Sequence, residues 1–510
     1  MKQIQSRHSV IVGVILSAGM SSRMGQFKPM LPLSGTSFIK RIISTMREAG
    51  VEEIVVVSGA RRSELEEHLA GENVKLLFNA QYATTQMLES IKLAIREAQR
   101  YADAILVTPV DVALPDVAVY RTLLRRFKDS DCIRPVYRGH GGHPVMIGRR
   151  VFPMILAYEG QNGLKGALRE AGAVTEEVKV NHPGILMDAD TPEDYQQVLS
   201  FLESEKDYIA VAGGLNIDIG GTSQKALVAM DSNPGTVRSS LGGVARNIAH
   251  NLCLMGQHVS LFTAYGDDQY REMIEDSADA AGLDLTGALC VPHGTTATYL
   301  FLNEPDGNLS VAVNDMQICS RLTPDYFAKH LERINGAKLL ILDANLPEES
   351  VAYLTEHVHI PIFADMVSAA KAGVFLPYLS RLHTIKANLL EAEVLSGIRI
   401  TDEETLLAAG KKLHDSGIRQ VFLSRGKDGM LAVSDTIKQV AAINARPVNM
   451  TGAGDACVAA LAVAFLQGKN PEEMAKYANA AASIAIESEE TVSEKISITE
   501  IESRVREENA

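Results

Sequence analysis

Short apolar runs alternate with amphipathic segments through the first half of the chain. Runs of this kind, rich in Val, Ile and Leu, are typical of strands that are buried on both faces of a parallel sheet. The segments between them repeat apolar residues at helical spacing, so the pattern predicts an α/β domain with a parallel sheet. The expected strands are 10–16, 53–58, 74–78 and 104–109, and the expected helices are 39–49, 63–69 and 87–99.

A second alternation of the same kind fills the other half. The expected strands are 208–212, 338–343, 361–364, 384–386 and 420–424, and the expected helices include 244–255 and the alanine-rich run 456–465. Segments 299–302 and 309–313 flank the turn-forming stretch 303–308, which predicts a β-hairpin. The hairpin could cover a substrate and exclude water, or it could be an edge hairpin that does not move.

A short charged stretch, 203–207, separates the two halves and has no apolar pattern. The chain has 510 residues, which is too long for one hydrophobic core. Charged stretches without apolar periodicity are typical of domain boundaries. We therefore predict two α/β domains, residues 1–204 and 205–510, with the boundary near Ser204.

The composition narrows the choice of partners and compartment. The net charge is −14 and no long run of Lys and Arg occurs, which argues against nucleic-acid polymers as partners. The five cysteines are scattered without a C-x-x-C pair, a pattern typical of reduced thiols in the cytoplasm. The apolar run 10–16 is too short to span a bilayer and lacks a signal-peptide cleavage pattern, so we expect no membrane segment.

The stretch NMTGAGD, residues 449–455, offers the clearest candidate chemistry. Gly452, Ala453 and Gly454 can bring successive backbone N–H groups together at a helix N-terminus, where the dipole also favours a negative phosphoryl oxygen. Asp455 would lie beside this anion hole and could take a proton from an attacking alcohol. Taken alone, the motif is equally compatible with an ordinary glycine turn and an aspartate cap.

Two glycine-rich segments near the start of the second half carry candidate substrate-binding residues. Asn216 and Asp218 follow the first strand, and their amide and carboxylate could hold sugar hydroxyls. Gly242 and Gly243 open the helix that carries Asn247 on its first turn, where a ligand can approach the backbone closely. Two polar glycine segments of this kind favour a substrate site over accidental turns.

Further polar residues follow the later strands, at the edge where α/β sheets bind ligands. Asn388 and Glu391 are spaced as N-x-x-E and could steer Mg²⁺ through water, although this spacing is also common at helix starts. Ser424 ends another strand, and Gly426 and Gly429 form a bend suited to nucleotide contact. These residues could therefore contact a nucleotide and its metal ion.

In the first half, the strand 10–16 runs directly into a loop of small residues, 17–25. Gly19 would let a ligand approach the backbone of this loop. Arg23 and Lys28 add positive charge beside it. The combination predicts a phosphate-binding loop.

Acidic residues occur where the same half could hold a metal ion. Asp111 follows the strand 104–109 at the carboxyl edge of the predicted sheet, and Mg²⁺ prefers carboxylate ligands. Asp188 and Asp190 form a second acidic pair. One of the two could instead cap the helix that begins at Pro192.

Four motifs of the first half resemble the MobA-like nucleotidyltransferases, and among them the molybdenum-cofactor cytidylyltransferases. They are LSAGMSSRMGQFKPMLPL, VTPVDVALP, RPVYRGHGGHPVMIG and ILMDADTPEDY, and they occur in the family's order. The resemblance implies a Rossmann-like α/β domain. In it, Arg23 and Lys28 would hold the triphosphate of CTP or another NTP, and Asp111 with Asp188 or Asp190 would hold Mg²⁺.

The remainder, after Asp207, resembles the ribokinase-like, PfkB-type sugar and nucleoside kinases. Its ordered motifs are GGLNIDIGG, GGVARNIAHNLCLMG, KANLLEAE, SRGKDG and NMTGAGDA. GGVARNIAHNL, VAVNDM and VNMTGAGDA resemble the pseudouridine kinases within that family. The resemblance implies an α/β domain with a small β lid. Its site would consist of the base Asp455, the anion hole Gly452 to Gly454, the ribose-binding Asn216, Asp218, Gly243 and Asn247, and the ATP-binding Asn388, Glu391, Gly426 and Gly429.

Together the resemblances imply a bifunctional enzyme that uses ATP, Mg²⁺ and a small-molecule substrate. The second half would phosphorylate the 5′-hydroxyl of a nucleoside, with pseudouridine favoured and another sugar or nucleoside as the alternative. The first half departs from its family at 83–86, where relatives carry a glycine, so its acceptor stays open. It could transfer a nucleotide or only bind one. Association into a homodimer also stays open.

Overall fold

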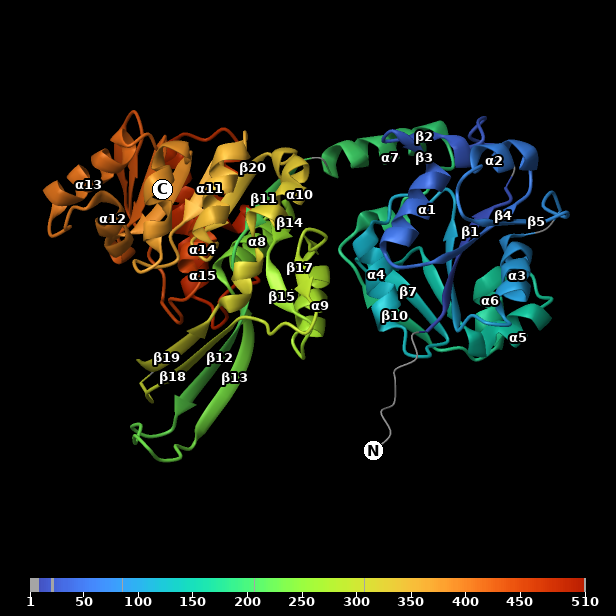
Figure 1. The fold of residues 1–510 in the computed structure, drawn as a ribbon, viewed down its shortest axis with the longest axis horizontal. Helices are drawn as coiled ribbons and strands as arrows, with labels where there is room; N and C mark the ends of the chain where they lie inside the picture. Colours follow the sequence, from blue (N-terminus) through green and yellow to red (C-terminus); the bar gives the residue numbers. More distant parts are fainter. Residues whose placement is uncertain (1–8, 20–22, 85, 206, 307, 509–510) are drawn as a thin grey trace. The chain divides into compact units, whose positions relative to one another are not determined.

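The computed structural model of the chain describes residues 9–19, 23–84, 86–205, 207–306 and 308–508. Contacts divide the chain into two compact units, residues 1–205 and 206–510 (Figure 1). The helix α7, Pro192–Glu205, continues into the charged stretch 203–207 that separates the two halves. Glutamate is a good helix former, so the loss of apolar pattern did not end the helix.

The described part of the first unit contains an eight-stranded sheet in the order β10-β7-β9-β6-β1-β4-β5, with β8 paired to β7. The strands β4, β1 and β6 are parallel, as predicted. β9 runs antiparallel to β6 and β7, so the sheet as a whole is mixed rather than parallel. The connection from β7 to β9 is too short for the crossover that a parallel return requires. The strands are β1 Ile11–Ser17, β4 Glu53–Ser58, β5 Lys75–Phe78, β6 Ala104–Pro109, β7 Cys132–Tyr137, β8 His140–Gly141, β9 Val145–Gly148 and β10 Thr175–Lys179, with the separate pair β2 Pro32–Leu33 and β3 Thr36–Ser37.

Helices cover both faces of this sheet, because successive side chains of a strand point to opposite sides. Val12 and Val14 of β1 lie in a core shared with α3 and α5, whereas Ile15 lies in a core shared with α1 and α4. The first unit is therefore a three-layer α/β fold. The helices that precede α7 are α1 Phe38–Glu48, α2 Arg62–His68, α3 Met87–Ala98, α4 Val117–Arg126, α5 Phe152–Ala157 and α6 Gly163–Glu170.

A nine-stranded sheet, in the order β16-β14-β11-β20-β21-β22-β23-β24-β25, forms the centre of the second unit as far as the structure describes it. The strands β16, β14, β11, β20, β21, β22 and β23 of this sheet are parallel to one another. β24 and β25 are added at the edge beside β23, each antiparallel to the strand before it. Asp343, Asp365, Asn388 and Ser424 each end one of four neighbouring strands, so they meet at the carboxyl edge. The strands are β11 Tyr208–Ala212, β14 His258–Phe262, β16 Leu283–Asp284, β20 Leu339–Asp343, β21 Ile362–Asp365, β22 Thr384–Asn388, β23 Gln420–Ser424, β24 Met430–Val433 and β25 Ile437–Val440.

Helices also cover both faces of the second sheet and form two hydrophobic cores. The helix α14 is apolar on all sides, and Ala459, Ala460 and Ala462 are fully buried in it, as expected of a helix enclosed by other elements. It contacts both α8 and α15. The helices are α8 Val244–Leu254, α9 Arg271–Ala281, α10 Pro324–Asn335, α11 Glu348–His357, α12 Leu389–Ser396, α13 Glu403–Asp415, α14 Ala453–Leu466, α15 Pro471–Ile486 and α16 Ile498–Glu508.

A separate sheet, the lid, extends from the body of the second unit (Figure 1). In its described residues it has four strands in the order β13-β12-β18-β19. The predicted hairpin is confirmed as the antiparallel pair of β18 and β19. β12 and β13 were not predicted, because their glycines and short polar residues have weak strand preference and the pairing itself decides the structure. The lid strands are β12 Asn216–Ser223, β13 Gly235–Gly242, β18 Thr298–Asn303 and β19 Leu309–Asp315, and a further pair is β15 Ala264–Gly266 and β17 Leu289–Val291.

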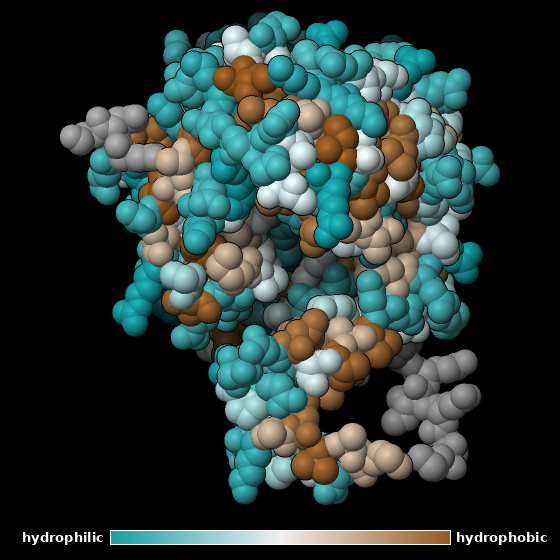
Figure 2. All heavy atoms as spheres, turned by 90° about the vertical axis from the view of Figure 1, so that its left-hand side faces the viewer, coloured by the Kyte–Doolittle hydropathy of each residue, from teal (hydrophilic) through white to brown (hydrophobic). Residues whose placement is uncertain are grey.

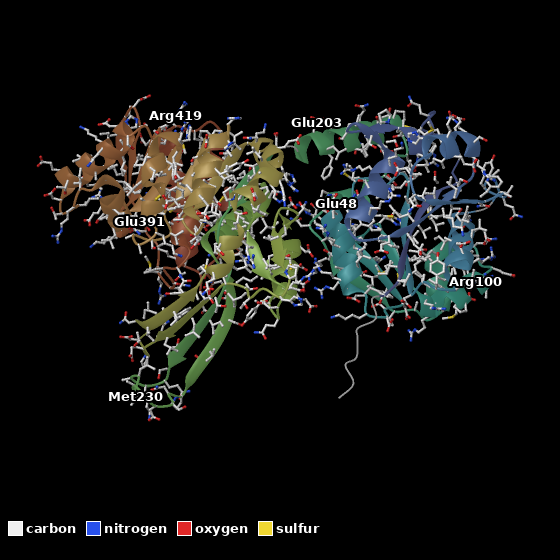
Figure 3. All side chains as sticks on the ribbon, viewed as in Figure 1. Glu48, Arg100, Glu203, Met230, Glu391 and Arg419 are labelled. Atoms are coloured by element: carbon white, nitrogen blue, oxygen red, sulfur yellow. The ribbon has the colours of Figure 1, made fainter. Side chains whose placement is uncertain are left out.

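Apolar side chains are exposed on the lid strands, and hydrophobic residues are visible at the surface of the lid in Figure 2. They are Val237, Leu300, Leu302, Leu309, Val311 and Val313. Met230, in the loop between β12 and β13, lies at the far end of the lid (Figure 3).

The remaining global predictions concern membranes and thiols. No helix in the described ranges combines the length and the apolar character needed to cross a membrane. All five cysteines of the chain are free thiols.

Candidate active sites

The motif around Asp455 forms the predicted glycine turn at the N-terminus of α14. Gly452 is the N-cap of this helix and has a φ of +84°. A Cβ atom at Gly452 would lie 2.0 Å from the carbonyl oxygen of Thr491, so both the conformation and the available space require glycine. Asp455 occupies the first helical turn and is buried. The helix thus presents free backbone N–H groups beside a buried carboxylate.

The surroundings of Asp455 raise the pKa of its carboxyl group. Oδ2 of Asp455 accepts a hydrogen bond of 2.9 Å from Nδ2 of Asn247. Burial raises the pKa of Asp455 to about 8, and the charge of Asp365 adds to this effect, while Asn247 and Lys386 oppose it. A base works best when its pKa lies near the working pH. The predicted residues Asn247 and Asp455 are therefore in direct contact, and burial brings the pKa of the carboxyl near neutrality.

Lys386 on β22 is a further site residue that the motifs did not single out. Its ammonium lies 3.7 Å from the carboxylate of Asp365, and a Cβ atom on Gly454 would lie 2.7 Å from its Nζ. Burial opposes the charge of Lys386, yet the carboxylate of Asp365 and other acidic groups hold its pKa above the ordinary value. Gly454 thus leaves space for a cation next to the anion hole. In the sequence, a lysine inside the otherwise apolar strand that ends at Asn388 is the feature that could have indicated this buried cation.

The candidate sugar site lies where the lid joins the body. Asn216 pairs with Gly242 between β12 and β13, and Nδ2 of Asn216 donates a hydrogen bond of 2.7 Å to Oδ1 of Asp218. A Cβ atom on Gly242 would lie 2.3 Å from Oδ2 of Asp218, so the glycine makes room for the carboxylate. Burial raises the pKa of Asp218, whereas Asn216 and Arg246 oppose the rise. These residues form part of the lid and not the loop after the first strand that the sequence predicts.

Asp343 connects the two glycine segments of this site. Its Oδ2 accepts hydrogen bonds of 2.9 Å from the backbone N–H groups of Gly214 and Ala245, the second of which lies at the start of α8. Gly243 has a φ of +97°, and a Cβ atom on it would lie 2.5 Å from the carbonyl oxygen of Gly214. A buried carboxylate at a helix N-terminus is stabilised by the unpaired N–H groups there. Asp343 was seen in the sequence only as the end of a strand.

The predicted ATP-side residues lie at the ends of β22 and β23. Asn388 and Glu391 form a capping box at the start of α12, in which both carboxylate oxygens of Glu391 accept 2.8 Å hydrogen bonds from Asn388 (Figure 3 labels Glu391). Because these oxygens are engaged, the pair fits a cation held through water better than one bound directly. Asn388 is the sheet partner of Ser424, and Gly426 and Gly429 follow in a tight bend with positive φ angles.

In the first unit, Lys28 connects the two predicted acidic groups. Its Nζ lies 3.4 Å from Oδ2 of Asp111 and also contacts Oδ1 of Asp190. Arg23, with a side chain that is 79% exposed, lies 3.8 Å from Asp190. The structure therefore gathers Arg23, Lys28, Asp111 and Asp190 as one charged cluster.

The predicted Mg²⁺ ligands of this cluster do not form a ready metal centre. Among the described residues, no group of three or more His, Cys, Asp or Glu side chains is arranged to hold a metal ion. Burial raises the pKa of Asp188, and the charges of Asp190 and Asp111 raise it further. A bound cation would compensate this negative charge, and the ammonium of Lys28 compensates part of it through Asp111 and Asp190. Coordination by Asp111, Asp188 and Asp190 stays a prediction.

An open cavity of about 190 Å³ adjoins the charged cluster, which is below the range of about 300–1,000 Å³ that is usual for small-molecule sites. Gly19, Lys28 and Asp111 line it together with Tyr82 and Gln86. The segment that departs from the family pattern, 83–86, therefore contributes directly to this cavity through Gln86.

Comparisons with known proteins agree with the division of the chain. The family model of pfkB family carbohydrate kinases matches residues 206–497, and that of the MobA-like NTP transferase domain matches residues 13–176. The pseudouridine kinase of Escherichia coli K12 is 37% identical over 59% of this chain and 97% of its own length. The molybdenum cofactor cytidylyltransferase of the same organism is 27% identical over 37% of this chain and 94% of its own length.

A solved carbohydrate kinase from Agrobacterium tumefaciens matches the second unit with a TM-score of 0.53 and 28% identity, over 59% of this chain and 97% of that structure. The chain belongs to the pfkB family of carbohydrate kinases. It is a kinase of this family fused to a MobA-like nucleotidyltransferase domain. The predicted fold, two α/β domains of these kinds with a small β lid in the second, is confirmed.

Proposed function

We propose that the second unit transfers the γ-phosphoryl group of ATP to the 5′-hydroxyl of pseudouridine. The observation that carries the proposal is the buried Asp455 carboxyl, which lies at the N-terminus of α14 and accepts a hydrogen bond from Asn247. A kinase for an alcohol needs both a base and an anion site at one place. The likeness to a pseudouridine kinase in sequence supports the choice of substrate.

In this proposal each group has one task. Asn216 and Asp218 bind ribose hydroxyls and present the 5′-hydroxyl to Asp455, which accepts its proton as the new P–O bond forms. The N–H groups at the start of α14 and the ammonium of Lys386 stabilise the charge on the transferred phosphoryl group. The lid covers the sugar and keeps water from competing with it.

The proposal includes Mg²⁺ on the ATP side. Mg²⁺ bound with ATP would shield the phosphate charge, and Asn388 and Glu391 would hold it through water. Ser424, Gly426 and Gly429 would contact the nucleotide at the end of β23. Removing divalent cations with EDTA should stop turnover, and adding Mg²⁺ back should restore it.

A panel of acceptors tests the substrate. The purified protein is incubated with Mg-ATP and equal concentrations of pseudouridine, uridine, adenosine, ribose and fructose, and ADP release and the phosphorylated products are measured. Preferred formation of pseudouridine 5′-phosphate is the expected result. Phosphorylation of ribose, fructose or adenosine without pseudouridine would contradict the substrate and favour the alternative of another sugar or nucleoside kinase.

We infer that the first unit is a Mg²⁺-dependent nucleotidyltransferase that uses CTP or another NTP. The contact of Lys28 with two carboxylates beside an open cavity supports this function. The alternative is a module that binds a nucleotide without transferring it, which the altered segment 83–86 favours. Pyrophosphate release from CTP or GTP, measured with an Asp455→Asn chain to silence the kinase, distinguishes the two. Nucleotide binding without release across a range of acceptors would favour the module.

A further inference from the structure

Arg246 is a buried cation close to the candidate base. It lies on α8 and is only 8% exposed. Its guanidinium donates hydrogen bonds of 3.2 Å to Oδ1 of Asn247, 3.1 Å to Oγ of Ser277 on α9, and 3.4 Å to the carbonyl oxygen of Leu241 on β13. A charge is rarely buried unless it has specific partners. The contact to Asn247 connects Arg246 to Asp455.

The amide of Asn247 has a different neighbour at each end. Its oxygen accepts from Arg246, and its nitrogen donates to Asp455 at 2.9 Å. A guanidinium carries donors only, so the group of Asn247 that faces it must be the acceptor oxygen. The NH₂ group is then turned toward the carboxylate. The contact with Arg246 therefore determines which end of the amide meets Asp455.

We propose that Arg246 is a positioning residue for phosphoryl transfer, which holds the Asn247 amide so that it donates to the carboxylate of Asp455. This inference rests on the proposed role of Asp455 as the base. Without Arg246, only the carboxylate itself would favour the NH₂ end of the amide, and a protonated Asp455 could donate to the amide oxygen instead. Two oxygens in contact favour the protonated carboxyl, which cannot accept the proton of a hydroxyl.

The charges that surround Asp455 set the direction of the expected pH effect. Burial raises the pKa of Asp455, and Asn247 is one of the groups that lower it. Loss of the Asn247 donor should therefore raise the pKa further and require a higher pH to form the carboxylate. The ionisable groups that face Asp455 are Asp365 from β21, Lys386 from β22, Asp343 from β20 and Cys457 from α14 itself.

Arg246 itself and its neighbours His250 and Cys253 do not titrate near neutral pH. Burial lowers the pKa of Arg246 to about 10, so it stays charged, and the nearby carboxylate of Asp218 favours this charge. Burial also lowers the pKa of His250, one turn further along α8, to about 4, so this side chain is neutral. Burial raises the pKa of Cys253 to about 12. A change in the pH profile on substitution of Arg246 would thus report on Asp455 or on Asp218, whose raised pKa Arg246 opposes, and the double-mutant cycle with Asn247→Leu distinguishes the two.

The test is the pH dependence of kcat at saturating ATP and nucleoside for the full chain and its Arg246→Met variant. We expect kcat at pH 7 to fall by about tenfold or more and the acid limb to move to higher pH, because one unit of pKa changes the carboxylate fraction about tenfold. The KM for ATP should change little. A folded Arg246→Met chain with unchanged kcat and an unmoved acid limb would overturn the proposal.

Three further variants separate positioning from a purely structural role. Ser277→Ala removes the contact to α9 and leaves Arg246 and Asn247 in place, so its pH profile should match the parent chain. Arg246→Lys keeps a charged donor group without the planar fork of the guanidinium, so it should recover part of kcat and serves as the main test if Arg246→Met does not fold. A profile shifted as far by Ser277→Ala as by Arg246→Met, or no difference between Lys and Met, would contradict positioning.

A double-mutant cycle with Asn247→Leu tests the connection itself. If Arg246 acts through Asn247, Arg246→Met should cost about twofold or less in the Asn247→Leu background. Full additivity of the two losses would overturn the proposal. Failure of the base assignment is distinguishable, since it would appear as near-normal kcat in Asp455→Asn, whereas failure of this inference leaves Asp455→Asn inactive and Arg246→Met normal.

Discussion

The two candidate sites handle charge in opposite ways. In the second unit Asp455 and Lys386 are 8% and 9% exposed, and burial raises the pKa of the carboxyl to about 8. In the first unit the side chains of Arg23 and Asp190 are 79% and 41% exposed, and ion pairs with Lys28 and Arg23 compensate the charge of Asp190. One site buries both its carboxyl and its ammonium, while the other surrounds the buried ammonium of Lys28 with charged groups that solvent reaches.

This difference follows from the chemistry that each site is proposed to carry out. A base that removes a proton from an alcohol needs a pKa near neutrality, and burial is the simplest way to raise that of a carboxyl. Binding a triphosphate requires accessible positive charge and a metal ion, and it does not require a base with a raised pKa. We therefore expect the second site to respond strongly to the loss of single buried groups and the first to respond to the loss of charge.

The largest effect is expected from Asp455→Asn. The amide keeps the size of the carboxylate but cannot accept the hydroxyl proton, so kcat should fall by roughly two or more powers of ten. The affinities for ATP and nucleoside, measured by calorimetry, should change little. Asp402→Asn, at the exposed N-cap of α13, is the matched control and should keep its kcat. Near-normal turnover in Asp455→Asn would remove Asp455 as the base.

Lys386→Met should have the next largest effect. Methionine fills a similar volume without the charge beside Gly454, so phosphoryl stabilisation is lost and kcat should fall by about one to two powers of ten. The KM for ATP should rise as well, since the charge also acts on bound nucleotide. Lys438→Met, at an exposed position on β25, provides the comparison. Equal activity of the two variants would place Lys386 outside the site.

The stability of the second unit should depend on pH through Asp455. The folded chain holds this proton up to pH about 8, whereas the unfolded chain releases it near pH about 4. Stability contributed by this group therefore falls as pH rises between these values. Asp455→Asn should be more stable than the parent chain at pH 8, with little difference at pH 4, in thermal unfolding curves. A parent chain that gains stability relative to the variant over this range would show that the pKa is not raised.

Cys457→Ala is expected to have the smallest effect. The thiol is buried, donates a hydrogen bond to the carbonyl oxygen of Ala478, and has its pKa raised by burial to about 11. It is therefore a packing group and not a nucleophile. We expect kcat within about twofold of the parent chain. A loss above tenfold in folded protein would give this thiol a role in the chemistry.

Local patterns predicted much of the fold. The bounds of β4 and β6, at 53–58 and 104–109, match the apolar runs, and the glycine turn before α14 forms at its predicted place. Each of these features depends on side-chain periodicity or on a backbone conformation that only glycine adopts easily. The position of Asp455 on the first turn of a helix follows from the same local information.

Contacts between distant segments could not be read from local patterns. Asn247 and Asp455 are separated by 208 residues and meet only because α8 and α14 pack together. The placement of Lys386 beside Gly454 depends likewise on the sheet and on α14. Strand β12 contains the weak strand formers Gly220 and Gly221, and it exists because of its neighbours β13 and β18. Pairing and burial decide these features, and neither has a local sequence signal.

The most direct test of independent sites assays one preparation of each full-length chain for two reactions, pseudouridine phosphorylation and pyrophosphate release from CTP or GTP. The chains are the parent, Asp111→Asn and Asp455→Asn. We predict that Asp111→Asn loses pyrophosphate release and keeps kinase kcat within about twofold, and that Asp455→Asn shows the reverse. The reason is that sites in separate hydrophobic cores are seldom energetically coupled. Loss of both activities in either folded variant would contradict the account of two separate sites.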